Sequence, residues 1–177
     1  MERRVILQTE RLAVTTWRPE DLDDLNRLHS DPVTMAFIGG RPETWDESAI
    51  RLDQYLGEQG SRGWTKWRVE GDGGRMIGRA GFGGYGEDRE LGYTIDRALW
   101  GQGLATEVAT ALVAWHTSHL ASWSTGAARP MRLWGYADVD NAASLRVLAT
   151  SGLHPVEVRE HAGRPYAFFR LDRSNPD

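Results

Sequence analysis

The chain has 177 residues and no cysteine. Disulfide bonds, thiolate metal sites and a cysteine nucleophile are therefore excluded. The chain also has no excess of basic residues, because 25 Asp and Glu residues outnumber 21 Lys and Arg residues and give a formal net charge of −4. Proteins that bind nucleic acid usually carry a basic patch, so we expect no nucleic-acid partner.

Long apolar runs are missing as well. The segment Met1–Gln8 contains none, so we expect neither a signal peptide nor a membrane span, and we interpret the chain as a cytoplasmic protein. The five histidines show no metal-ligand spacing with carboxylates, and we expect no metal. A hydrophobic fraction of 40% and a charged fraction of 26% are typical of a soluble globular domain.

The most informative segment is Trp100–Glu107, which reads Trp-Gly-Gln-Gly-Leu-Ala-Thr-Glu. Before it, the aromatic and β-branched residues of Glu90–Ile95 predict a strand. After it, apolar residues recur at helical spacing from Leu104 to Trp115. Two glycines thus lie where a loop enters a helix, and a helix start offers unpaired N–H groups and a partial positive charge. The sequence therefore predicts a site for an anion here, most often a phosphate.

The remaining periodicity predicts alternating blocks of strands and helices. Strands are expected at 12–17, 64–70, 76–82, 89–95, 131–137, 154–160 and 166–171. Helices are expected from residue 18, from a capping pattern in which Thr44 precedes Glu47, after the glycine loop, and over 142–150. Short turns make the three middle strands antiparallel, whereas the strand–helix–strand unit from 89 to 137 requires a parallel crossover. We expect one domain over residues 1–177, built on a mixed sheet with helices on both faces.

Three motifs, in this order along the chain, resemble the GNAT N-acetyltransferases. Asn26–Pro42 is similar to the N-terminal helices of one branch of that family. Trp100–Ala105 resembles the family's acetyl-CoA loop, Arg/Gln-x-x-Gly-x-Gly/Ala, and Trp100 at its first position resembles the RimJ/RimL-like branch that acetylates ribosomal-protein N-termini. Asp140–Leu148, followed by Gly152, resembles the Asn-x-x-Ser helix of that branch. The resemblance implies an α/β (α+β) fold with a mostly antiparallel sheet of about seven strands flanked by about four helices.

The resemblance also implies acetyl-CoA as the co-substrate. Contacts with its pyrophosphate are carried over to the loop residues Gly101, Gln102, Gly103, Leu104, Ala105 and Thr106. The pantetheine arm is expected beside the backbone of Tyr93, Thr94 and Ile95, with further contacts from Asn141 and Ser144. Asn141 also has a local interpretation, because asparagine is a common N-cap residue.

Acetyl transfer needs a base for the amine and a proton donor for the leaving thiolate. Family members often place a glutamate on the strand before the loop, and Glu90 is the candidate base; the alternative is a solvated charge at a strand end. The family's tyrosine position, seven residues after Asn141, holds Leu148. Ser144 is therefore the candidate donor, with Tyr136 as a second choice, although both could be structural. Glu107 is explained by the helix dipole.

The acceptor is expected to be a primary amine, either a protein N-terminus or a small molecule, attacked directly without an acyl-enzyme. Candidate wall residues are Phe37, Ile38, Trp45, Trp64 and Trp67, for which core packing is the alternative. Glu43, Asp46 and Glu47 could attract a cationic amine or simply begin a helix. An α-amine, with a pKa of about 7.7–8.0, needs less help from a base than a lysine at about 10.4.

Alternatives from other classes stay open at this stage. One is a non-catalytic acetyl-CoA sensor or scaffold, and another is a protein that uses the glycine loop for NAD or ATP, although the third glycine of a dinucleotide fingerprint is missing. The family resemblance also suggests a homodimer.

Overall fold

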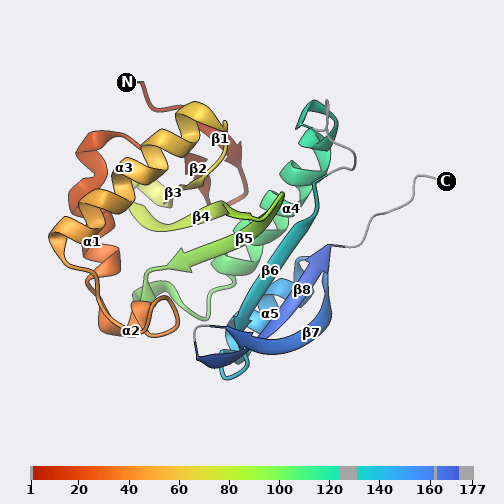
Figure 1. Cartoon of the computed structure of the whole chain (residues 1–177). Helices are drawn as coiled ribbons and strands as arrows, with labels where there is room; N and C mark the ends of the chain where they lie inside the picture. The colour runs from red at the N-terminus through yellow and green to blue at the C-terminus, as the bar shows by residue number, and fades with distance from the viewer. Residues whose placement is uncertain (1, 124–130, 162, 172–177) are drawn as a thin grey trace.

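The computed structural model describes residues 2–123, 131–161 and 163–171. Within these ranges, eight strands form one sheet in the order β1-β2-β3-β4-β5-β6-β8-β7 (Figure 1). The strands are β1 (Val5–Gln8), β2 (Ala13–Thr15), β3 (Lys66–Glu70), β4 (Met76–Tyr85), β5 (Asp88–Ile95), β6 (Leu133–Asp138), β7 (Leu153–His161) and β8 (Arg164–Leu171). The α-helices are α1 (Leu22–His29), α2 (Pro32–Met35), α3 (Trp45–Ser61), α4 (Leu104–Trp123) and α5 (Ala142–Thr150).

The pairing of the strands confirms the mixed, mostly antiparallel sheet. Neighbouring strands are antiparallel except β5 and β6, which are parallel and are connected through α4. The sheet has eight described strands where the sequence predicts about seven, and the additional strand is β1. Four residues are too few for a periodic pattern, and β1 is defined instead by its pairing with β2.

The two faces of the sheet carry separate apolar cores. The larger core lies under α4 and α5 and includes Trp67, Phe82 and Leu112. The smaller core joins α1 and α3 to the opposite face through Leu25, Leu52 and neighbouring residues. Figure 1 shows α1 and α3 in front of the first half of the sheet. The helices α4 and α5 lie behind the sheet. Helices therefore cover both faces, as the sequence predicts, but the front of β6 and β8 has no described helix over it.

Local signals in the sequence explain where α3 begins. The Thr44 hydroxyl accepts a hydrogen bond from the Glu47 backbone N–H (3.3 Å), and the Glu47 carboxylate accepts one from the Thr44 N–H (2.8 Å). This reciprocal pair is the predicted capping box, and it satisfies two N–H groups that the helix itself cannot bond.

Two glycines provide a matched test of this packing. A Cβ at Gly78, on the inner strand β4, would lie 2.2 Å from the Thr94 carbonyl oxygen, and backbone cannot move aside cheaply. We expect Gly78→Ala to lower the free energy of unfolding by about 1–3 kcal/mol, as overpacking does. Gly57 is exposed within α3 and has open space around it, so Gly57→Ala should raise stability by about 0.5–1 kcal/mol. Urea unfolding measures both, and equal effects would contradict the packing described.

Candidate active site

The site is organised by the divergence of two parallel strands. β5 and β6 pair at only two positions, Arg89 with Leu133 and Glu90 with Trp134. Beyond these, β5 continues to Ile95 and β6 to Asp138 without further pairing to each other, and Figure 1 shows the two strands spreading apart. Every second backbone group of β5 beyond Glu90 therefore faces the gap rather than a strand. Such groups can pair with an extended ligand as an added strand would.

The glycine loop lies at the open end of β5. Gly101 and Gly103 both have φ of 76°, in the left-handed region that glycine adopts without strain. A Cβ at Gly101 would meet no atom within 4 Å, so the space beside the loop is open. The first intrahelical bond of α4 runs from Glu107 N–H to Gly103 C=O, which leaves the preceding N–H groups of the helix start for a ligand.

Two side chains hold the glycine loop in place. The Trp100 indole N–H donates to the Ile95 carbonyl (2.7 Å), which ties the loop to the end of β5. Arg11, from the turn between β1 and β2, donates to the Gln102 carbonyl (2.9 Å) and to the Glu107 carboxylate (2.6 Å). Glu107 thus does more than complement the helix dipole, because it fastens Arg11 beside the loop. Sequence reasoning missed Arg11, which lies about ninety positions away in the chain.

The start of α5 lies on the far side of the gap. The Asn141 side chain accepts from the Ser144 backbone N–H (3.1 Å), so its local interpretation as an N-cap is confirmed. Tyr93 reaches across from β5, and its hydroxyl donates to the Ser144 carbonyl (3.0 Å). Burial raises the pKa of the Tyr93 hydroxyl, which keeps it protonated as this donor. Leu148 is buried and fills the space over Gly135, so the tyrosine position of the family holds an apolar packing residue.

Glu90 lies at the vertex where β5 and β6 separate. It is 8% exposed, and its Oε2 lies 2.8 Å from the Lys66 Nζ. Glu90 is therefore a buried, ion-paired carboxylate and not a solvated charge at a strand end. Burial, together with the negative charge of the nearby Glu90, raises the pKa of the Tyr136 hydroxyl to about 12.

Known proteins match this arrangement over most of the chain. The family description "Acetyltransferase (GNAT) domain" matches residues 11–154. The chain belongs to the GNAT acetyltransferase family.

Solved structures of acetyltransferases share the fold. A GNAT acetyltransferase from Bacillus anthracis superposes with a TM-score of 0.77 at 17% identity, over 93% of this chain and 96% of that one. The ribosomal L7/L12 α-N-protein acetyltransferase RimL, solved with coenzyme A, gives 0.75 at 16% identity over 94% and 97%. The ribosomal-protein-S5-alanine acetyltransferase of Vibrio fischeri gives 0.75 at 14% identity over 96% and 97%. The RimJ/RimL branch is thus represented among the structural neighbours, at identities that show the fold alone.

The predicted acceptor wall of this acetyltransferase divides into exposed and buried residues. Phe37 and Trp45 are exposed, and Ile38 lines a cavity of about 290 Å³ between the loop after α2 and the helix α3. Trp64 and Trp67 are core residues, and Trp67 packs edge-on against Trp115 of α4 at a ring distance of 5.3 Å. An acceptor on the surface cannot touch Trp67 in this arrangement.

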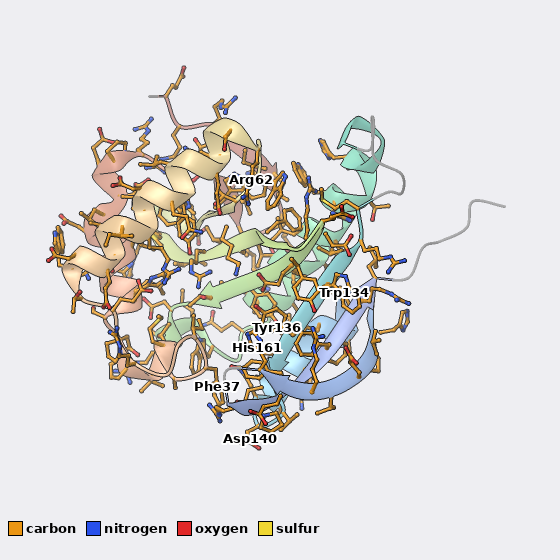
Figure 2. All side chains as sticks on the ribbon, in the orientation of Figure 1. Phe37, Arg62, Trp134, Tyr136, Asp140 and His161 are labelled. Carbon is orange, nitrogen blue, oxygen red and sulfur yellow. The ribbon has the colours of Figure 1, made fainter. Side chains whose placement is uncertain are left out.

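An aromatic surface that the sequence analysis did not identify lies on the uncovered front of β6 and β8. Tyr136 stacks on Phe168 at a ring distance of 5.1 Å and contacts His161 at 5.3 Å. Figure 2 shows Trp134, Tyr136 and His161 together on this front, with Phe37 close to them. The Arg164 guanidinium lies 5.9 Å from the Phe37 ring, so the loop after α2 contacts the β7–β8 hairpin. The alternation in Trp134-Gly135-Tyr136 was the signal available in the sequence.

A buried network fixes the loop that carries Phe37. Arg79 donates to His29 Nε2 (2.9 Å), so the proton of the neutral ring is on Nδ1, which donates to the Glu43 carboxylate (2.8 Å). Arg51 also donates to Glu43 (2.5 Å), and Arg41 is paired with Glu47. The two glutamates predicted to attract an amine are therefore neutralised within the protein. Among the described residues no cluster of His, Asp and Glu could hold a metal ion, and none of the helices could span a membrane.

The network predicts a pH dependence of stability. Burial, reinforced by the charge of Arg79, lowers the pKa of His29 from 6.5 to about 4. Between these values the unfolded chain binds a proton that the folded chain excludes, so stability falls as the pH falls. We expect His29→Gln, whose amide can accept from Arg79 and donate to Glu43, to remove about 1.4 kcal/mol of the loss between pH 7.5 and 5.5. Urea unfolding at both pH values tests this, and His116, whose pKa is also lowered to about 4, adds a loss of the same sign that the variant keeps. An unchanged pH dependence in the variant would contradict a neutral, buried His29.

Proposed function

We propose that this GNAT protein transfers the acetyl group of acetyl-CoA to a primary amine by direct attack in a ternary complex. The observation that carries the proposal is the buried carboxylate of Glu90 at the vertex between β5 and β6, together with a glycine loop, open at a helix start, at the other end of β5. RimL, a structural neighbour, was solved with coenzyme A, which supports the same co-substrate here. Acceptors compatible with the neighbours are protein N-terminal α-amines, and a small-molecule amine fits the same chemistry.

The glycine loop is the proposed pyrophosphate site. The backbone N–H groups of Gly101, Gln102, Gly103, Leu104, Ala105 and Thr106 would bind the anion, and the helix dipole of α4 favours its charge. Arg11 lies beside this loop, and its charge is already balanced by the Glu107 carboxylate at 2.6 Å. The pair therefore holds the loop in place, and the backbone N–H groups and the helix dipole provide the attraction for the anion. The backbone of Tyr93, Thr94 and Ile95 faces the gap that would hold the pantetheine arm.

The proposed chemistry needs two proton transfers. The amine nitrogen forms a bond with the acetyl carbon, the carbon–sulfur bond breaks, and the proton of the amine passes to Glu90 through a water molecule. Backbone N–H groups of β5 in the gap would stabilise the negative oxygen of the intermediate. Ser144, in the first turn of α5, would donate a hydrogen bond from its hydroxyl to the leaving thiolate, which then takes up a proton from solvent. Asn141 and Tyr93 hold the backbone N–H and C=O of Ser144 in place.

The acceptor would approach over the front of the sheet. Phe37 and Trp45 remain wall candidates, and the aromatic surface of Trp134, Tyr136 and His161, under which Phe168 is buried, forms the opposite side. Aromatic side chains supply a large contact area with little conformational freedom to lose. We propose that this surface contacts the body of the acceptor, while its amine reaches Glu90.

The glycine loop is tested by a bulky side chain. We expect Gly103→Val to abolish measurable binding of coenzyme A in calorimetry, because the branched side chain would occupy the space of the phosphate. Gly163→Val is the control, since Gly163 has nearly the same φ, 77° against 76°, and lies in open space at the turn between β7 and β8. If both variants bind coenzyme A like the parent protein, the loop is not the phosphate site.

The base is tested by removing its charge. We expect Glu90→Gln to lower kcat by about 10²–10⁴-fold with an amine acceptor and to shift the pH–rate profile, with little change in coenzyme A affinity. Release of free coenzyme A over a panel of amines gives the rates. If wild-type protein binds coenzyme A and no amine raises its release, the protein is a sensor or scaffold instead.

A further inference from the structure

Lys66 is the only lysine in the chain. All the remaining residues among the 21 Lys and Arg residues are arginines, and so are the cations of the other ion pairs described above. The side chains differ, because an ammonium group is compact and strongly hydrated whereas a guanidinium group is planar and broad. The one position that departs from arginine is also the one that contacts Glu90.

The sheet is shaped to deliver this ammonium group. Lys66 begins β3 and lies two strands away from Glu90, in a row where Lys66 pairs with Gly81 and Gly81 pairs with Gly92. A Cβ at Gly92 would lie 2.5 Å from the Lys66 Cε and 2.6 Å from its Nζ. A Cβ at Gly83 would lie 2.8 Å from the Glu90 Oε2. The lysine side chain therefore crosses the sheet over bare backbone, and two glycines provide the space for the ion pair.

The ion pair changes the charge that an acceptor meets. Three glutamates considered above for the amine each face a cation within the protein: Glu43 faces Arg51, Glu47 faces Arg41 and Glu90 faces Lys66. Asp46, the other acid predicted to attract the amine, is exposed at the start of α3. A protonated amine arriving at Glu90 would thus approach an ammonium group about as closely as a carboxylate. Like charges so placed oppose binding, and the effect is strong where water is largely excluded.

We propose that Lys66 is the specificity-determining residue of the acceptor site: it excludes amines that arrive protonated and selects amines that arrive neutral. The inference rests on the function proposed above. An α-amine, with a pKa of about 7.7–8.0, is neutral in a substantial fraction of molecules near pH 7.5, whereas an alkyl amine near 10.4 is almost entirely charged. Lys66 binds one oxygen of Glu90, and the other oxygen accepts the proton of the amine through water.

The kinetic test compares two acceptors in three variants. The acceptors are a lysine-free peptide with a free α-amine and the linear triamine spermidine. We expect Lys66→Met to improve kcat/KM for spermidine relative to the peptide by about tenfold, mainly through a lower KM, because the uncovered carboxylate then attracts a cation. Lys66→Arg should keep the parental preference, since it restores the charge. Arg75→Met, which removes one exposed cation at the β3–β4 turn, should leave the ratio unchanged.

The outcomes separate this inference from the proposed function. Wild-type turnover with a ratio that Lys66→Met does not change overturns the role of Lys66 alone. Wild-type protein that acetylates neither acceptor, nor any other amine of the panel, overturns the proposed function and this inference with it.

A second measurement needs no turnover. Because the chain has one lysine, protein labelled with ¹³C at lysine Cε gives a single lysine signal that needs no assignment. We expect that signal to shift in Glu90→Gln, which removes the charge beside it, and to stay in place in Glu47→Gln, which removes a charge from a different ion pair. A signal that Glu90→Gln leaves unmoved would show that the ion pair does not form in solution and would overturn the proposal.

Discussion

The site depends on the separation of β5 from β6 after two paired positions. Neighbouring parallel strands usually form backbone hydrogen bonds along their length, but the pairing of β5 with β6 ends at Glu90 and Trp134. The helix α4 connects the two strands. The glycine loop that precedes α4 must therefore lie at the end of β5 that no longer pairs with β6. The gap, the loop and the buried carboxylate are thus consequences of one topological feature. Tyr93 stabilises this arrangement, because the hydrogen bond from its hydroxyl to the Ser144 carbonyl connects β5 with α5 across the gap.

Charge is handled differently on the two sides of this gap. At the loop, the N–H groups of the helix start and the helix dipole give a positive potential, and Arg11 is paired with Glu107. On the front of the sheet, Glu47, Glu43 and Glu90 are paired with Arg41, Arg51 and Lys66. The front also presents aromatic rings from β6 and β8 rather than exposed acids. Under the proposal made above, this arrangement would favour a neutral amine and would make binding depend on the body of the acceptor.

Leu148 is an apolar packing residue at the position where many family members carry a tyrosine. Leu148 fills the space over Gly135, where a Cβ would lie 2.5 Å from it. A phenol cannot take this place without moving the β6 backbone or the α5 helix. A hydrogen bond to the leaving thiolate would then come from the helix start or from Tyr136, and the first turn of α5 is already oriented by Asn141 and Tyr93.

The sequence by itself determined the local structure and the family. The glycine pair before an apolar periodic segment and the Thr44 and Glu47 cap each depend on residues close together in the chain, where propensity and hydrogen bonding act directly. The crossover from 89 to 137 follows from the order of strand, helix and strand along the chain. Only the tertiary structure decided which side chains meet: Lys66 with Glu90, Arg11 with the glycine loop, His29 between Arg79 and Glu43, and Trp67 in the core rather than at the surface. These contacts follow from strand order and from the face on which each side chain lies, and no local pattern encodes a meeting of residues that the sheet brings together from distant positions.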